Sequence, residues 1–96
     1  MKREEVLLRL REAWPALSAL GVRSLLLFGS VARGEAREES DVDLAVDLEG
    51  PITFDRFMAL KLYLEEVLGR PVDLVRLQAL KPPLRRLVEE EGLRVA

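Results

Sequence analysis

The segment VDLAVDL, Val42 to Leu48, alternates strictly between apolar and other residues, and this alternation constrains the fold more than any other feature. Residues two apart in a β-strand project to the same side. Val42, Leu44, Val46 and Leu48 therefore face one way, and Asp43, Ala45 and Asp47 face the other. The segment predicts a strand with one apolar face and one face that carries carboxylates.

The flanking segments predict helices and strands in alternation. In chain order we expect a helix over residues 3–20 that kinks or restarts at Pro15, a strand over 22–28 covered on both faces, one helical turn at 31–33, the strand at 42–48, a helix over 53–68 capped by Thr53, a strand over 71–77, a helix over 82–91 and a short final strand. This order predicts an α/β (α+β) fold, with a small mixed β-sheet flanked by helices. We expect one domain over residues 1–96.

Two helices and the aromatic residues supply most of the expected core. The first helix buries a stripe at helical spacing: Val6, Leu10, Ala13, Trp14, Leu17 and Leu20. The helix over 53–68 has a wide apolar side: Phe54, Phe57, Met58, Leu60, Leu64, Val67 and Leu68. Trp14, Tyr63 and the phenylalanines are expected in the core, with a nucleotidyl acceptor role as the alternative for Tyr63. An apolar face on this second helix too large for one core would favour a protein partner.

The composition excludes several classes of function. The 96 residues hold 15 Lys and Arg against 17 Asp and Glu, a net charge of −2, so we expect no direct nucleic-acid binding. The chain has no Cys and no His, so a bound metal must be held by oxygen, which favours Mg²⁺. No apolar run approaches the roughly 20 residues of a membrane span. The start MKREEVLLRL lacks a signal-type apolar core, so we expect no export and a cytoplasmic protein.

Three aspartates form the candidate metal site. Asp41 and Asp43 project to the same face, roughly 6.5 Å apart along the backbone, if the strand begins at or before Asp41. Their carboxylates can then share one cation or two cations about 3.5–4 Å apart. Asp73 lies in the later strand and can complete the cluster if the two strands are neighbours. An alternative is that such aspartates point to water from a half-exposed sheet, which we favour for Asp47.

The Gly29-Ser30 dipeptide follows a strand of buried character and is the candidate phosphate-binding turn. Gly29 permits a tight turn and close backbone approach, and Ser30 offers its hydroxyl and N–H where a short helix begins. Arg33 has two interpretations: it helps to hold phosphate, or it pins the turn at Gly34 through an ion pair, which we favour. Ser40 is expected to stabilise the turn before Asp41.

The combination of GS at 29–30, ten intervening residues and DVD at 41–43 resembles the DNA polymerase β-like nucleotidyltransferase superfamily. Within it, LFGSVARGEAREESDVDLAV followed by RPVDLVRL looks like the minimal, MNT-type nucleotidyltransferases, over nearly the whole chain. The resemblance implies that Asp41 and Asp43 bind two Mg²⁺ ions. It also implies that Asp73 binds the catalytic ion and helps to activate the attacking hydroxyl, while Gly29 and Ser30 hold the outgoing phosphates.

The activity that the resemblance implies is transfer of a nucleoside monophosphate, usually AMP from ATP, to a hydroxyl with release of pyrophosphate. Proteins of this type commonly act as the antitoxin of a helical HEPN partner, whose tyrosine they modify with AMP. Two alternatives stay open: a non-catalytic subunit that neutralises its partner by contact, and a subunit that adenylylates a small molecule. Little chain follows Asp73, so we expect a partner or a homo-oligomer to supply the remaining walls of the site.

Overall fold

A computed structural model describes residues 1–37 and 40–95 of the chain. The elements, in chain order, are α1 (Arg3–Glu12), α2 (Trp14–Ala19), β1 (Val22–Phe28), α3 (Gly29–Arg33), β2 (Val42–Leu48), α4 (Phe54–Leu68), β3 (Val72–Arg76), the 3₁₀ turn η1 (Leu77–Ala79), α5 (Pro82–Glu91) and β4 (Leu93–Arg94). This confirms the predicted order. The first helix breaks at Ala13, two residues before Pro15, and the strand expected over 71–77 ends at Arg76, where η1 begins.

The strands form one mixed sheet in the order β3-β2-β1-β4. Strand β1 is antiparallel to both β2 and β4, whereas β2 and β3 are parallel. Parallel neighbours need a crossover connection, and α4 provides it between β2 and β3. The sheet is therefore the small mixed sheet that the element order predicts, and β3 is an edge strand.

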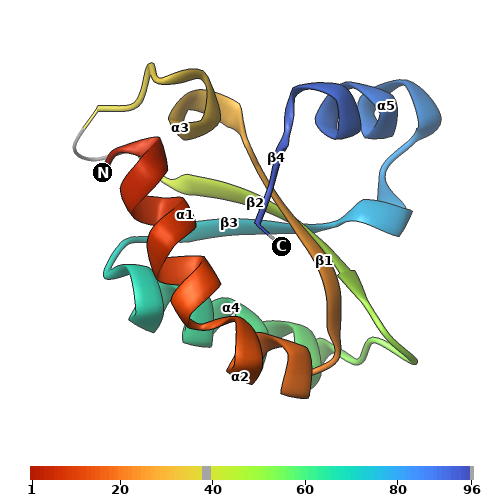
Figure 1. Cartoon of the computed structure of the whole chain (residues 1–96). Helices are drawn as coiled ribbons and strands as arrows, with labels where there is room; N and C mark the ends of the chain where they lie inside the picture. The colour runs from red at the N-terminus through yellow and green to blue at the C-terminus, as the bar shows by residue number, and fades with distance from the viewer. Residues whose placement is uncertain (38–39, 96) are drawn as a thin grey trace.

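One face of the sheet carries the main hydrophobic core. The alternating residues of β2 are all buried there, at 0–3% exposure: Val42, Leu44, Val46 and Leu48. They form one cluster with Leu60, Leu64 and Leu68 of α4 and with Val6, Leu10 and Leu17 of the first two helices. Figure 1 shows α2 and α4 together at one end of the molecule and α3 and α5 at the other. The predicted alternation of β2 is confirmed.

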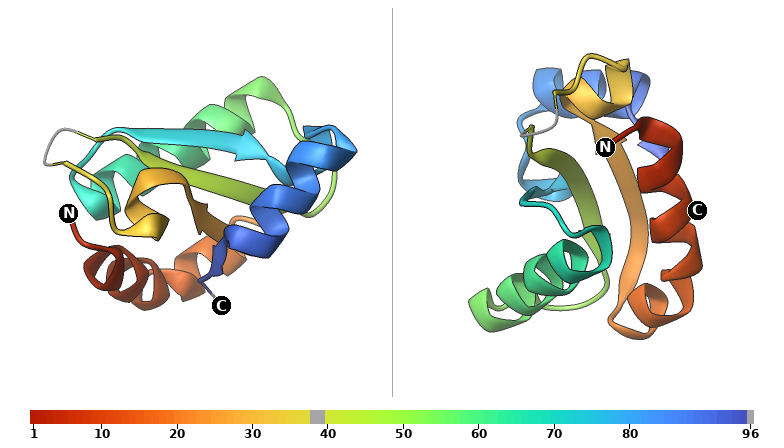
Figure 2. Two further views of the ribbon diagram at one scale, coloured as in Figure 1. Left: turned by 90° about the horizontal axis from the view of Figure 1, so that it is seen from above. Right: turned by 90° about the vertical axis from the view of Figure 1, so that its left-hand side faces the viewer.

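The opposite face of the sheet is covered only in part. Ala45, Leu77 and Val88 form a smaller buried cluster, against which Leu26 and Phe28 of β1 pack. Strand β1 therefore contributes apolar side chains to both faces, as predicted. Seen from above, α3 and α5 lie apart, with β2 and β3 visible between them (Figure 2).

Two residues expected in the core are exposed, and both lie at helix ends. Leu20 is the C-cap of α2 and is 45% exposed, and Phe54 is the first residue of α4 and is 77% exposed. The core side of α4 begins one turn later, at Phe57, which packs against the main cluster together with Trp14 and Tyr63. Across residues 1–37 and 40–95, no helix combines the length and the apolar character needed to cross a membrane.

Arg56 joins the connection between β2 and α4 to the end of α2. Its Nη1 donates to the carbonyl oxygens of Glu49 at 2.6 Å and Pro51 at 2.9 Å, and its Nη2 donates to that of Leu20 at 3.1 Å. Gly21 leaves room for the guanidinium, because a Cβ at that position would collide with Nη2. Three backbone carbonyls from two separate turns thus depend on one side chain.

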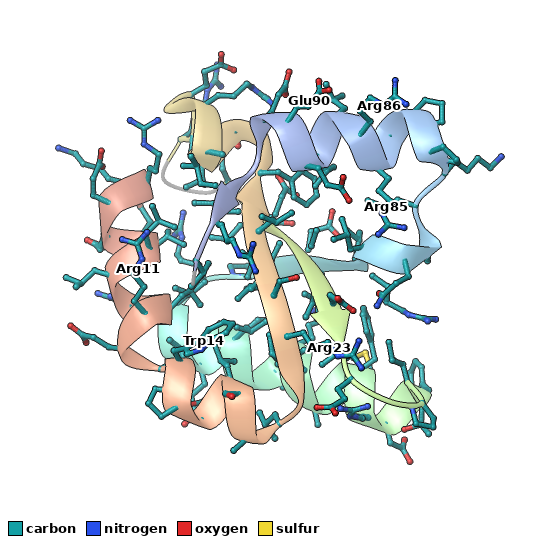
Figure 3. All side chains as sticks on the ribbon, turned by 45° about the vertical axis from the view of Figure 1, so that its right-hand side comes forward. Arg11, Trp14, Arg23, Arg85, Arg86 and Glu90 are labelled. Carbon is teal, nitrogen blue, oxygen red and sulfur yellow. The ribbon has the colours of Figure 1, made fainter. Side chains whose placement is uncertain are left out.

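We expect Arg56→Ala to lower the free energy of unfolding by about 2 kcal/mol, because charge-assisted hydrogen bonds to three carbonyls are lost together. Urea denaturation followed by circular dichroism measures the change. The matched control is Arg86→Ala, since Arg86 lies on the outer side of α5 (Figure 3) and we expect its loss to change stability by less than about 0.5 kcal/mol. Equal effects of the two substitutions would show that the three bonds contribute nothing.

Candidate active site

The register of the sheet brings Asp43 and Asp73 together. Asp43 of β2 is the Cα partner of Phe28 in the antiparallel neighbour β1 and of Asp73 in the parallel neighbour β3. Residues paired across a sheet share one face. The two carboxylates therefore lie on the face opposite the main core, at the end of the sheet where β1 finishes and β2 and β3 begin.

Asp41 lies beside this pair but outside the strand. Strand β2 begins at Val42, so Asp41 directly precedes it and its side chain is exposed. Among residues 1–37 and 40–95, no three acidic side chains are arranged as a group that holds a metal ion as they stand. The structure thus assembles two of the three predicted carboxylates and leaves Asp41 as a neighbour of the pair.

The neighbouring carboxylates repel one another, and this repulsion helps to shift the pKa of Asp43. Partial burial raises the pKa of Asp43, and the charges of Asp73 and Asp41 raise it further, as does a hydrogen bond with Asp73. The charge of Arg33 lowers the same pKa and so opposes these effects. Ionised carboxylates crowded in this way are stabilised by a cation. Since the donors are oxygen atoms, the chemistry of the group fits a hard cation such as Mg²⁺.

Asp47 lies on the same face of β2 but outside the carboxylate group. It is half-buried and accepts a hydrogen bond from Nε2 of Gln78, just after β3. Its partner is therefore an amide rather than a second carboxylate.

The Gly29-Ser30 turn is pressed against Asp43. Gly29 has φ +75°, a backbone conformation that residues other than glycine rarely adopt. A Cβ at this position would lie 2.9 Å from Cγ of Asp43. Ser30 is the second residue of α3, and within the described part of the chain its hydroxyl makes no hydrogen bond. The predicted phosphate turn and the predicted metal ligands thus meet at one point.

Arg33 and Ser40 hold the loop beside the site. Nε of Arg33 forms an ion pair with Oε2 of Glu35 at 3.2 Å, next to Gly34 with φ +74°, which is the favoured structural interpretation. Its charge still acts on Asp43, so a contact with phosphate is compatible with this pair. The Ser40 hydroxyl accepts a hydrogen bond from the backbone N–H of Arg37 at 2.9 Å, as its predicted turn role requires.

Two residues near the site were not singled out in the sequence. Phe28, expected only in the core, is half-buried and lies beside Asp43. Its position directly before the Gly-Ser turn is the sequence signal that could have placed it near the site. Arg3 donates through Nη1 to the carbonyl oxygen of Ala32 at 3.1 Å and so braces the C-terminal end of α3. A contact across 29 residues has no local sequence signal.

Comparisons with known proteins show which family and which solved structures this chain is similar to. The family model described as polymerase beta, nucleotidyltransferase matches residues 17–96. The protein adenylyltransferase MntA of Thermococcus cleftensis is 46% identical over 71 residues, which are 74% of this chain and 72% of that protein. A solved structure assigned to the minimal nucleotidyltransferases is 45% identical, with a TM-score of 0.82, and the match covers 97% of this chain and 95% of that chain.

A toxin–antitoxin structure solved with AMP-PNP also matches, at 25% identity and a TM-score of 0.71, over 100% of this chain and 73% of that chain. The family match extends over most of the sequence and includes Gly29, Ser30 and all three aspartates. This chain therefore belongs to the polymerase β-type nucleotidyltransferases, the enzyme family that its GS and DVD spacing predicts.

Proposed function

We propose that this protein is a Mg²⁺-dependent adenylyltransferase that transfers AMP from ATP to a hydroxyl of a partner protein, as the antitoxin of a HEPN/MNT pair. The observation that carries the proposal is the direct pairing of Asp43 with Asp73, with the Gly29-Ser30 turn against Asp43. The MntA relative is named a protein adenylyltransferase, and the toxin–antitoxin structure contains AMP-PNP. We extend both features to this chain, as one nucleotidyltransferase domain over residues 1–96.

The side chains divide between the metal and the phosphates. Asp43 and Asp73 supply oxygens for the cation, and Asp41 adds a third carboxylate from the start of the strand. Bound Mg²⁺ would neutralise phosphate charge and lower the pKa of a hydroxyl that it coordinates. Gly29 and Ser30 hold the outgoing phosphates with backbone N–H groups and the Ser30 hydroxyl, and Arg33 adds positive charge beside them.

The proposed transfer is a single displacement at the α-phosphorus of ATP. The acceptor oxygen bonds to the α-phosphorus, the bond from that phosphorus to the pyrophosphate oxygen breaks, and pyrophosphate leaves. Asp73, whose side chain is exposed, is placed to take the proton of the attacking hydroxyl. Attack and departure are roughly in line, so the acceptor approaches from the side opposite the Gly29-Ser30 turn. On that side lies β3, the edge strand, which leaves the approach open to a segment of another protein.

The surface of α4 favours a protein as the partner. Phe54 and Leu62 are 77% and 58% exposed, more than a helix in contact only with its own core requires. Beside Phe54, a hollow is lined by Ile52, Phe57 and Arg76, and Arg76 is in the same edge strand as Asp73. Arg76 pairs with Val46 and not with Asp43, so this hollow lies on the face of the sheet opposite Asp73. A partner that covers these apolar side chains would have to extend around the edge strand β3 to deliver a hydroxyl to the site.

The test is incubation of the protein with α-³²P-labelled ATP, Mg²⁺ and the HEPN-type partner, resolved on a denaturing gel. We expect label on the partner, loss of label with EDTA, and no label from γ-³²P-labelled ATP, because the γ-phosphate leaves in pyrophosphate. Labelling that persists in EDTA would reject the metal assignment. Label on a small molecule instead of the partner would reject the protein acceptor.

A second candidate function is neutralisation of the partner by contact alone, which the exposed residues of α4 also permit. The variant with both Asp41→Asn and Asp43→Asn separates the two, since it removes metal ligands at one end of the sheet and leaves α4 unchanged. We expect this variant to lose protection of cells against the partner. Full protection by the variant would favour the contact mechanism.

A further inference from the structure

Exposed large apolar side chains occur on both sides of the sheet. Among the described residues, four belong to the helices of the main core: Leu8, Leu20, Phe54 and Leu62. Only Leu84 and Leu87, at 50% and 46% exposure, belong to the helix on the carboxylate face, α5. Within the described residues, Leu84 and Leu87 are therefore the exposed large apolar side chains that lie on the same side of the sheet as Asp43 and Asp73.

The helical geometry of α5 shows which way the two leucines face. Val88 is the buried residue of α5 and points to the sheet, where it packs with Ala45 and Leu77. Successive residues rotate by about 100°, so Glu89 lies on one flank of Val88, and Leu84 and Leu87 lie on the other. Arg86 and Glu90 are expected on the outer side, where Figure 3 shows them.

The flank that carries the leucines faces the catalytic end of the sheet. Glu89 lines a hollow of about 310 Å³ together with Ser24 and Leu26, residues of β1 that precede Phe28. The opposite flank, with Leu84 and Leu87, therefore points away from this hollow, towards the end of β1 at which Phe28 lies. Because Phe28 is the Cα partner of Asp43 and also packs against the cluster of Val88, an apolar surface continues from the carboxylates to α5.

We propose that Phe28, Leu84 and Leu87 form the platform on which the base of the bound nucleoside triphosphate rests. A nucleotide combines a charged tail with a flat aromatic base, and a site for it needs polar groups for one and apolar contacts for the other. In this chain the carboxylates and the Gly29-Ser30 turn supply the polar groups for the charged tail. The platform supplies the apolar contact on the same face. This inference rests on the proposed function and adds Phe28, Leu84 and Leu87 to the nucleotide site.

The test measures binding of two ligands, Mg²⁺–ATP and Mg²⁺–tripolyphosphate, by isothermal titration calorimetry. Tripolyphosphate has the tail of ATP and lacks the base. We expect the variant with Leu84→Ser and Leu87→Ser to bind ATP about five- to twentyfold more weakly, with unchanged affinity for tripolyphosphate. The matched control is Leu8→Ser, an exposed leucine of α1 on the other side of the sheet, which should leave both affinities unchanged. Replacement of both α5 leucines by methionine should retain ATP binding.

The outcomes separate the platform from the proposed function. Unchanged ATP affinity in the Leu84 and Leu87 variant, or an equal loss for both ligands, would overturn the platform alone. Failure of the wild-type protein to bind either ligand would overturn the proposed function together with the platform. Since both leucines are about half exposed, the serine variant should keep the wild-type melting temperature within about 3 °C, and a leucine-to-alanine pair provides a second, milder test.

Discussion

Asp43→Asn should raise the thermal stability of the metal-free protein while it removes most of the AMP transfer. The two effects have one cause, which is the partly buried charge of Asp43 beside the carboxylates of Asp73 and Asp41. Asparagine has nearly the same shape but no charge, so it relieves the repulsion and also removes a metal ligand. We expect transfer to fall by roughly a hundredfold to a thousandfold, as for loss of a preorganised electrostatic contact in other enzymes.

The gain in stability depends on pH, and its sign follows from the pKa. Because burial and the charges of Asp73 and Asp41 raise the pKa of Asp43, the folded protein holds this proton more tightly than the unfolded chain. The resulting stability is complete below the ordinary pKa of 3.8 and is lost as the pH rises through the raised value. The variant is neutral at every pH, so its advantage over the wild type should appear as the pH rises from 4 towards 7.

Directly opposed like charges in a sheet cost about 0.5–1 kcal/mol, so at neutral pH we expect a gain of about 3–6 °C in melting temperature. Differential scanning fluorimetry in EDTA at a series of pH values measures it, and added Mg²⁺ should stabilise the wild type more than the variant. Asp47→Asn is the control, since that residue shares the strand and the face and can still accept the hydrogen bond of Gln78. A variant that melts below the wild type at neutral pH would show that repulsion is not significant.

Local patterns in the sequence predict most of the fold because each has a local physical cause. The alternation in β2 buries Val42, Leu44, Val46 and Leu48 on one face. Thr53 caps α4 because its side chain accepts a hydrogen bond from the backbone N–H of Arg56. The order of the strands has no such local cause. Nothing in the sequence shows that β1 lies between β2 and β4, because that arrangement depends on contacts between residues that are far apart in the chain.

The candidate site was predicted in its residue types and only in part in its arrangement. Three aspartates and a Gly-Ser turn can be read from spacing, but the pairing of Asp43 with Asp73 requires β3 to lie beside β2 in one particular register. The position of Asp41 outside the strand depends on where pairing begins, a boundary that alternation does not fix.

The platform on α5 illustrates a different reason for a missed residue. Leu84 and Leu87 occur at ordinary helical spacing, which in sequence is indistinguishable from a core stripe. Only the structure shows that Val88 is the buried residue of α5 and that the leucines on its flank stay about half exposed. In the same way, Phe54 fits the apolar pattern of α4 and is exposed because the helix begins before its contact with the core does.

Gly29→Ala should disable the site with a single methyl group. The new Cβ would lie 2.9 Å from Cγ and 3.1 Å from Cβ of Asp43, distances at which one of the two segments must move. The backbone at φ +75° adds about 1–2 kcal/mol of strain for a residue with a side chain. We expect transfer to fall at least about a hundredfold, because a displacement of about 1 Å in a catalytic group has effects of this size.

Gly34→Ala separates the clash from the backbone strain. Gly34 has nearly the same φ, +74°, but a Cβ there would meet no atom of residues 1–37 and 40–95 within 4 Å. Both variants should therefore lose about 1–2 kcal/mol of stability from the backbone, measured by urea denaturation, and Gly29→Ala should lose further stability from the collision. Only Gly29→Ala should lose transfer of labelled AMP. If the two variants transfer AMP equally well, the contact between the Gly-Ser turn and Asp43 does not position the reacting groups, and the site proposed around it is wrong.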